Sequence, residues 1–320
     1  MISIVIPVFN EAESLPQLHR EIDETARAND LDLEVVFVND GSTDASWETI
    51  RSLATSDNRV RGICFRRNFG KAAALSAGFL AARGNVILTL DADLQDDPKE
   101  IPRFLKALDE GKDVISGWKR TRYDPWHKVF PSRVFNWMVS KLTGVWLHDH
   151  NCGFKCYRTE VFREVRLYGE LHRFIPVLAF ARGFRVGEIE VAHRPRKFGQ
   201  SKYGMRRFVK GFLDLMTVKF LTSFSHRPQH ILGTIGLGAF GLGVLGLAWL
   251  AITWVIRLFQ PDWFLPLHQR PLLIYSVAAL LLGTQMLTMG FIAELLTAHN
   301  ARHADEYSIA ETTFKSASES

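Results

Sequence analysis

Residues 85–98 read NVILTLDADLQDDP, a mostly apolar run that passes directly into four closely spaced carboxylates. An uninterrupted apolar run is typical of a strand that is buried on both faces of a parallel sheet. Two similar runs come earlier in the chain, at Ile2–Val8 and Leu33–Val38. Helical patterns alternate with these runs, around residues 12–28, 43–56, 70–82 and 98–109. This alternation of strands and helices predicts a doubly wound α/β domain.

The composition is that of a folded chain. Of its 320 residues, 47% are hydrophobic and 23% are charged, which excludes a disordered or collagen-like chain. The three cysteines, Cys64, Cys152 and Cys156, are too few for a disulfide framework and fit a reducing compartment. No second Cys or His pair accompanies Cys152 and Cys156, so we do not expect a structural zinc site.

Polar side chains follow each of the three predicted strands at the point where the strand ends. They are Asn10-Glu11, Asn39-Asp40-Gly41-Ser42 and Asp91-Ala92-Asp93. In a doubly wound sheet, ligands bind beyond the carboxyl ends of the strands. Each cluster alone could be a helix N-cap, but three of them at one edge predict a ligand site.

Asp91 and Asp93 lie two residues apart after a buried strand, so both carboxylates are expected to project in the same direction. Mg²⁺ or Mn²⁺ uses such a pair and completes its shell with substrate phosphates and water. Gln95 is placed to be a third oxygen ligand, whereas Asp96 and Asp97 are expected to cap the following helix. An Asp-x-Asp sequence is also common in turns and caps.

Asp40 and Glu11 are candidates for nucleoside binding. A carboxylate at Asp40 can accept hydrogen bonds from a nucleobase N–H, and Gly41 would let a ring lie close. Glu11 can do the same for a base or a ribose. By themselves, both groups could equally be helix N-caps.

The pattern changes after Lys112. Further strands are expected at Val114–Gly117, Gly153–Arg158 and Phe184–Ala192. Residues 205–222 have adjoining apolar stripes with basic residues near their start, which predicts an amphipathic helix. A basic amphipathic helix beside a membrane span is expected to lie in the interface, and an ordinary surface helix is the alternative.

Two later stretches, residues 231–256 and 272–293, contain no charged residue. Each exceeds the roughly 20 apolar residues that span a bilayer, so we expect two membrane spans rather than buried core helices. Residues 201–230 contain six basic residues and one acidic residue. The net charge of this segment is therefore +5, the same as that of the whole chain. Basic flanks mark the cytoplasmic side, although Arg257 and Arg270 in the connecting loop argue against that orientation.

Small residues recur along the first span, at Gly236, Ala239, Gly243 and Gly246. Small residues on one face permit close approach of helices in lipid. This face is expected to pack on the second span or on another copy of the chain, so a homo-oligomer through the spans is an open alternative.

Four segments together resemble a known family: VIPVFNE (5–11), VNDGSTD (38–44), RNFGKAAALSAG (67–78) and LDADLQDDP (90–98). In this order they are similar to glycosyltransferase family 2 and, more narrowly, to its polyprenyl-phosphate glycosyltransferases, one branch of which has two C-terminal transmembrane helices. The resemblance covers roughly residues 1–230. It implies a Rossmann-like, nucleotide-sugar-binding (GT-A) α/β domain.

The implied organisation has six parts. They are a cytosolic GT-A catalytic domain (1–203), an interfacial amphipathic helix region (204–229), a first transmembrane helix (230–257), a short outer loop (258–271), a second transmembrane helix (272–296) and a cytosolic tail (297–320). The protein would therefore lie in the cell membrane with two spans.

The resemblance also implies residue roles. The nucleotide would be held by Pro7, Phe9, Glu11, Val38, Asp40, Asp91 and Ala92, and the metal by Asp91, Asp93 and Gln95. The catalytic set would be Asp93, Lys119, Arg133 and Lys202, with the basic residues at the acceptor phosphate and the leaving diphosphate. The candidates for sugar or acceptor contact are Asp149, Arg120 (the alternative to Lys119 as the basic residue after the strand at 114–117), Ser132, His172 and Arg173, of which the last two could instead only close the domain.

The chemistry of the residues agrees with that reading. A lipid phosphate is already an anionic nucleophile, so the difficulty is to bring two polyanions together, which calls for a metal and several cations. Solvated surface charge is the alternative for Arg133 and Lys202.

We therefore expect an inverting glycosyltransferase that moves a hexose, glucose or mannose, from a UDP- or GDP-sugar to undecaprenyl or dolichyl phosphate at the cytosolic membrane face. Mg²⁺ or Mn²⁺ would be the cofactor, and no nucleic acid is expected as a partner. The alternatives are a processive polysaccharide synthase, whose Gln-x-x-Arg-Trp signature is missing from the sequence, and a non-catalytic membrane scaffold.

Overall fold

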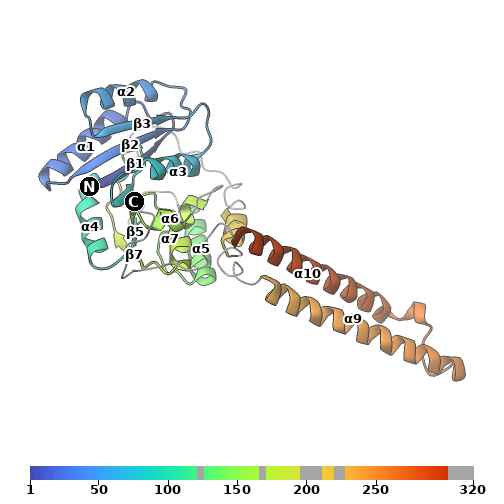
Figure 1. Cartoon of the computed structure of the whole chain (residues 1–320). Coiled ribbons are helices and arrows are strands. Elements are labelled where there is room, and N and C mark those ends of the chain that lie inside the picture. Colours follow the sequence, from blue (N-terminus) through green and yellow to red (C-terminus); the bar gives the residue numbers. More distant parts are fainter. Residues whose placement is uncertain (121–125, 166–170, 195–210, 220–227, 302–320) are drawn as a thin grey trace. The chain divides into compact units, whose positions relative to one another are not determined.

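The computed structural model describes residues 1–120, 126–165, 171–194, 211–219 and 228–301 (Figure 1). The chain forms two compact units, Met1–Thr222 and Ser223–Ser320. Of the predicted elements, both ends of the amphipathic helix (205–210 and 220–222) and the end of the C-terminal tail (302–320) lie outside the described residues.

The first unit contains a seven-stranded sheet in the order β3-β2-β1-β4-β6-β5-β7. The strands are β1 (Ile2–Val8), β2 (Leu33–Asn39), β3 (Val60–Cys64), β4 (Val86–Thr89), β5 (Val114–Trp118), β6 (Lys155–Arg158) and β7 (Val186–Glu190). Strands β3, β2, β1 and β4 are parallel neighbours, whereas β6 runs antiparallel between β4 and β5. The predicted α/β fold is confirmed, and all six predicted strands are present.

Helices alternate with these strands as the sequence predicts. They are α1 (Leu15–Ala28), α2 (Ser46–Ser56), α3 (Lys71–Ala81), η1 (Pro98–Glu100) with α4 (Ile101–Asp109), α5 (Trp126–Thr143), α6 (Val161–Glu164), η2 (Leu171–Phe174) and α7 (Ile175–Ala181). Strand β3 was not predicted. Arg61 and Gly62 interrupt its apolar run, and only Val60 of its five residues is buried because β3 lies at the edge of the sheet.

The central strand β1 is buried on both faces, as its unbroken apolar run predicts. Ile4 and Ile6 belong to a core that also contains apolar residues of α1, α2 and α4. Val5 belongs to a second core, which it shares with α3 and α7. Gly78 allows α3 to approach this face, because a Cβ there would lie 2.2 Å from Cγ1 of Val5.

Residues 211–219 are helical, within the range predicted for the amphipathic helix. Leu215 and Val218 are buried in a third core, together with Phe135 of α5 and Phe174 of η2. Leu213 on the same helix is 59% exposed. The helix is thus amphipathic, and its apolar side is buried within the first unit. Its location at a membrane interface stays a prediction.

The second unit is a pair of long helices, α9 (Pro228–Phe259) and α10 (Pro271–Ala301), with the short η3 (Leu267–Gln269) between them. Their stretches Gln229–Phe259 and Pro271–Leu295 have mean hydropathies of 2.1 and 1.8 and are long enough to cross a membrane. The glycine face of α9 packs on α10, as one of the two predictions stated. A Cβ at Gly243 would lie 2.7 Å from the Leu280 nitrogen, and one at Gly236 would lie 3.0 Å from the carbonyl oxygen of Gly283.

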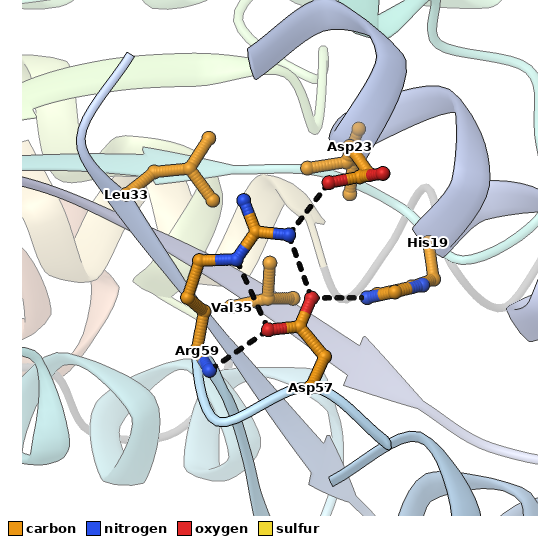
Figure 2. A pocket seen from close by; sticks show the side chains of 7 residues that line it. His19, Asp23, Leu33, Val35, Asp57 and Arg59 are labelled. Atoms are coloured by element: carbon orange, nitrogen blue, oxygen red, sulfur yellow. Dashed lines mark hydrogen bonds and ion pairs between the residues drawn. The ribbon is translucent and has the colours of Figure 1, made fainter. Parts of the chain in front are cut away.

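A cluster of ion pairs joins α1 to the loop before β3 at the amino end of the sheet (Figure 2). The guanidinium of Arg59 donates hydrogen bonds to Asp23 at 2.6 Å and to Asp57 at 2.8 Å and 3.0 Å. Nε2 of His19 lies 3.0 Å from Oδ2 of Asp57. The hydrogen bonds from Arg59 hold the pKa values of both carboxyls, Asp23 and Asp57, below their ordinary range.

This cluster makes stability depend on pH with a definite sign. A carboxyl whose pKa is lower in the folded state stabilises the fold above its unfolded pKa, near 4, and that stabilisation is lost as the pH falls. Asp57→Asn should therefore lower the free energy of unfolding by about 1–2 kcal/mol at pH 7. Below about pH 4, the difference in the free energy of unfolding between this variant and the wild type should become smaller. Thermal unfolding followed by circular dichroism from pH 7 to pH 3 measures both.

The matched control is Glu24→Gln, which changes an exposed carboxyl on α1, the helix that carries His19 and Asp23. Its unfolding midpoint should follow that of the wild type at every pH. If the loss of stability in Asp57→Asn stays the same from pH 7 to pH 3, the charged carboxylate does not have this role.

Candidate functional site

The loops that follow β1 and β2 are locked together by hydrogen bonds. The amide of Thr43 donates to Oδ1 of Asn10 at 2.8 Å, and the amide of Asn10 donates to Oγ of Ser42 at 2.9 Å. The amide of Glu11 donates to Oγ of Ser46 at 2.9 Å. Asn10 has a φ of 57°, a left-handed conformation that short polar side chains tolerate. Glu11 is therefore held at the carboxyl edge of the sheet, as the sequence predicts.

Asp40 is almost fully buried at the end of β2 and receives hydrogen bonds from another loop. Its carboxylate accepts from the amide of Phe69 at 2.7 Å and from that of Gly70 at 3.0 Å. Gly41 lets this loop approach, because it has a φ of +65° and a Cβ there would lie 2.3 Å from the carbonyl carbon of Arg67. Asp40 thus anchors the start of α3, and its predicted contact with a nucleobase would use its remaining lone pairs.

Asp91 forms an ion pair with Lys71, the first residue of α3. Burial raises the pKa of Asp91, but the Lys71 ammonium outweighs it and lowers the pKa to about 2. On the opposite side, the backbone of Gly153 lies against the carboxylate, since a Cβ there would be 2.6 Å from Oδ2. Lys71 was not among the predicted site residues, although it stands in the segment RNFGKAAALSAG.

A tight turn carries Asp93 and Gln95 beyond the end of β4. Leu94 has a φ of 62°, and Oδ1 of Asp93 accepts a hydrogen bond from the amide of Gln95 at 3.2 Å. Asp93 is 8% exposed and lies two residues after Asp91. The turn therefore presents two carboxylates and one amide side chain, which are hard oxygen donors of the kind that Mg²⁺ and Mn²⁺ use.

The predicted capping roles of the next two aspartates are half right. Oδ1 of Asp97 accepts a hydrogen bond from the amide of Lys99 at 3.1 Å and so caps η1. Asp96 does not cap this helix, and that prediction was wrong. Its Oδ1 instead lies 2.6 Å from the ammonium of Lys119, just after β5, and its side chain is fully buried.

Lys119 is 14% exposed, so its charge is largely removed from water. Burial alone would lower the pKa of Lys119, but the Asp96 carboxylate reverses this effect and the pKa is raised. The ammonium therefore stays charged beside the turn that carries Asp93. To contact a phosphate as predicted, the Lys119 ammonium would have to bind the phosphate together with Asp96 or break its ion pair with Asp96.

η2 brings two further candidates, His172 and Arg173, next to the start of α3. Both side chains are mostly buried. Burial lowers the pKa of His172 to about 2, and the nearby charges of Lys71 and Arg173 act in the same direction, so the imidazole is neutral at pH 7. The structure thus joins His172 to the group around Asp91.

Lys155 is a buried cation that the sequence analysis missed. Its Nζ donates to the carbonyl oxygens of His150, at 3.2 Å, and Cys152, and these bonds close the turn that leads into β6. Burial lowers the pKa of Lys155. The same turn holds the buried Asp149, whose Oδ1 accepts from the amide of Asn151 at 3.1 Å. A lysine inside the apolar run GFKCY was the available signal.

The remaining candidates fall into four groups. At the carboxyl edge of the sheet lie Pro7, Phe9, Val38 and Ala92, near the ends of β1, β2 and β4. Arg120 is 66% exposed and pairs with Glu190 at 3.4 Å. Arg133, on α5, is exposed and makes no ion pair with the described residues, while its neighbour Ser132 is partly buried. Lys202 lies outside the described residues.

Comparisons with known proteins identify the family of the chain. Residues 3–166 match the family described as glycosyl transferase family 2. Dodecaprenyl-phosphate galacturonate synthase of Rhizobium johnstonii is 37% identical over 92% of this chain and 87% of that protein. Undecaprenyl-phosphate 4-deoxy-4-formamido-L-arabinose transferase of Pseudomonas paraeruginosa is 35% identical over 92% of this chain and 85% of that protein.

Among solved structures, the chain resembles glucosyl-3-phosphoglycerate synthase from Mycobacterium tuberculosis in complex with Mn²⁺, UDP and phosphoglyceric acid. The TM-score is 0.55 at 16% identity, over 69% of this chain and 78% of that one. At this identity the likeness shows a shared fold, which is the expected GT-A fold.

The buried pair of Asp96 and Lys119 gives a test of the site's electrostatics. Asp96→Asn leaves a buried ammonium without its counter-charge and should cost about 3–5 kcal/mol. In a domain of this size each kcal/mol lowers the unfolding midpoint by roughly 2–4 °C. The double variant Asp96→Leu with Lys119→Met should recover most of the loss, because it removes both charges together. Thermal unfolding of the purified protein measures each midpoint.

Arg103→Met is the matched control, because it removes an exposed ion pair with Glu100 on the same segment. It should change the stability by less than about 1 kcal/mol. If Asp96→Asn is no more damaging than Arg103→Met, the charge on Lys119 does not depend on Asp96.

Proposed function

The chain belongs to glycosyl transferase family 2, and on that premise we propose that it transfers one sugar from a nucleotide sugar to a polyprenyl phosphate at a membrane surface. One observation carries the proposal: the carboxylates Asp91 and Asp93 stand at the carboxyl edge of the sheet, with the ammonium of Lys71 on Asp91. A diphosphate needs positive charge nearby, and a divalent cation held by these carboxylates would supply it. Membership of the family makes the chain an enzyme, so the non-catalytic scaffold is set aside.

The names of the relatives support the acceptor. Each of the two relatives described above is named for a polyprenyl phosphate, dodecaprenyl or undecaprenyl. An acceptor of this kind is held in a bilayer by its hydrocarbon chain. The two helices long enough to cross a membrane would place the enzyme in the same bilayer.

The donor sugar is the least constrained part of the proposal. The two relatives are named for galacturonate and for 4-deoxy-4-formamido-L-arabinose, and the structural neighbour was solved with UDP. We therefore place UDP-linked sugars of these two kinds beside UDP-glucose and GDP-mannose, which the sequence analysis favours.

The residues of the turn fit a divalent cation. Asp91 and Asp93 offer oxygen ligands, and the Gln95 side chain can supply another. Among the described residues no group of three His, Cys, Asp or Glu side chains is arranged around one point. Mg²⁺ and Mn²⁺ usually keep few protein ligands and complete their shells with phosphate and water. When bound, such a cation would neutralise charge on the diphosphate, and Lys71 would have to give up part of its contact with Asp91.

The reaction we propose is an in-line displacement. A phosphate oxygen of the lipid forms a bond to the anomeric carbon, and the bond from that carbon to the nucleoside diphosphate breaks, so the configuration inverts. No general base is needed, because the nucleophile is already an anion. Lys119, Arg133 and Lys202 would hold the two phosphate groups near each other, and the carboxylate of Asp149 would contact sugar hydroxyls.

The orientation in the membrane follows from charge. The basic residues of positions 201–230 precede the first apolar helix, so we place residues 1–203 on the cytosolic side and residues 258–271 outside. Nucleotide sugars would then reach the site directly from the cytosol.

Transfer of labelled sugar into an organic extract tests the function. Purified protein is incubated with Mn²⁺, undecaprenyl phosphate and each of the four nucleotide sugars in turn. We expect lipid-extractable label from one donor, and its loss with EDTA and in Asp93→Asn. Release of nucleoside diphosphate, with no transfer to lipid from any donor, would contradict the proposed acceptor.

Lys71 gives a second, directional prediction. In Lys71→Met the ammonium no longer competes for Asp91, so the Mn²⁺ concentration for half-maximal activity should fall about fivefold, which corresponds to ~1 kcal/mol between charges 4 Å apart in water. The maximal rate should also fall, because the diphosphate loses a cation. Lys71→Arg keeps the charge and serves as the control. A Mn²⁺ requirement that rises in Lys71→Met would contradict competition between Lys71 and the metal.

A further inference from the structure

Gln285 is a polar side chain near the middle of the longest apolar stretch of α10. Position 283 is the midpoint of Pro271–Leu295, so Gln285 lies about 3 Å from the centre of the stretch at 1.5 Å per residue. With a hydrocarbon core about 30 Å thick, the nearer boundary is then roughly 12 Å away. A glutamine side chain does not reach that far, so water cannot satisfy its amide.

The glycine-lined face of α10 is already occupied by α9. A Cβ at Gly283 would lie 2.4 Å from the nitrogen of Phe240, so the two backbones touch there. At 100° per residue, Gln285 lies about 200° around the helix from Gly283 and points away from α9. The structure agrees, since Gln285 is exposed. We call the residues on this side, Ile274, Ala278, Leu281, Gln285 and Ile292, the Gln285 face.

The two threonines that flank Gln285 on α10 are satisfied within their own helix. The hydroxyls of Thr284 and Thr288 donate to the carbonyl oxygens of Leu280 and Thr284, both at 2.9 Å. The amide of Gln285 makes no hydrogen bond with any described residue. An amide without a partner in hydrocarbon costs several kcal/mol, and lipid chains offer neither a donor nor an acceptor.

We propose that the Gln285 face packs against the same face of a second copy of the chain, with the two Gln285 amides hydrogen-bonded to each other. This rests on the membrane-spanning part of the proposed function. Copies inserted with one orientation place this residue at the same depth, and a two-fold axis along the membrane normal brings the pair together. An amide is both donor and acceptor, so two identical side chains satisfy each other.

The rest of the face suits this partner. Leu281 is 62% exposed, Ile292 is 53% exposed and Ile274 is 72% exposed, so apolar side chains extend above and below the amide. The interface lies on the opposite side of α10 from α9. It therefore does not compete with the packing of the two helices within one copy.

Association can be measured by energy transfer between donor- and acceptor-labelled copies in liposomes. Cys64 is the exposed cysteine among the three, so it takes the label. Gln285→Leu should weaken association about three- to thirtyfold, the range found for hydrogen bonds between membrane helices. Gln285→Asn keeps an amide and should weaken it less. Thr284→Val is the matched control, because its hydroxyl is already bonded within α10, and it should leave association unchanged.

Cross-linking identifies the face and the partner. In a Cys64→Ser background, Leu281→Cys and Ile292→Cys should form disulfide-linked dimers of this chain on oxidation in native membranes. Leu245→Cys, 67% exposed on α9, should not. Gln285→Leu with wild-type association, or cross-links that join the chain only to a different protein, would overturn the proposal.

Two readouts separate this proposal from the proposed function. Gln285 lies outside the site, so Gln285→Leu should keep its transfer activity, which also shows that it folds. Association without any transfer activity would contradict the function alone. Transfer activity with unchanged association of Gln285→Leu would contradict the interface alone. Release of the chain from membranes by carbonate would contradict the spans on which both depend.

Discussion

Carboxylates that gather at one edge of a sheet repel one another and lose water as they are buried, so each needs a positive partner close by. In this chain lysines meet that requirement, with Lys71 on Asp91 and Lys119 on Asp96. Each lysine comes from an element that is distant in sequence and adjacent in space. The two ion pairs therefore stabilise the edge without a ligand, and the positive charge that a diphosphate requires would come from a bound divalent cation.

Much of this edge is predictable from the sequence, because β1, β2 and β4 are apolar runs that end in polar residues. Parallel pairing then places those ends together. The edge strand β3 escaped prediction since Arg61 and Gly62 break its pattern. Asp96 looked like a helix cap because it precedes a proline-led helix, and only the fold brings Lys119 to it. Lys71 was overlooked for the same reason, since its partner lies 20 residues away.

The helical pair shows a similar limit. The glycines along α9 predicted a closely packed face, and its partner could have been either the second helix or another copy of the chain. In the structure the partner is the second helix, α10. Once that face is occupied, the amide of Gln285 is left exposed on the other side of α10, where it makes no hydrogen bond with a described residue. Which side of a membrane helix meets a second copy thus depends on which side its own neighbour has taken, and a single sequence pattern does not contain that information.

The central claim is that the carboxyl edge around Asp91 binds a nucleoside diphosphate through a divalent cation. Calorimetric titration of UDP and GDP into the purified protein tests it most directly, with Mn²⁺ and then with EDTA. The account predicts binding of one of the two nucleotides in Mn²⁺, at least tenfold weaker binding in EDTA, and no effect of Mn²⁺ in Asp91→Asn. Equal affinity with and without the metal, or an unchanged Mn²⁺ effect in Asp91→Asn, would contradict it.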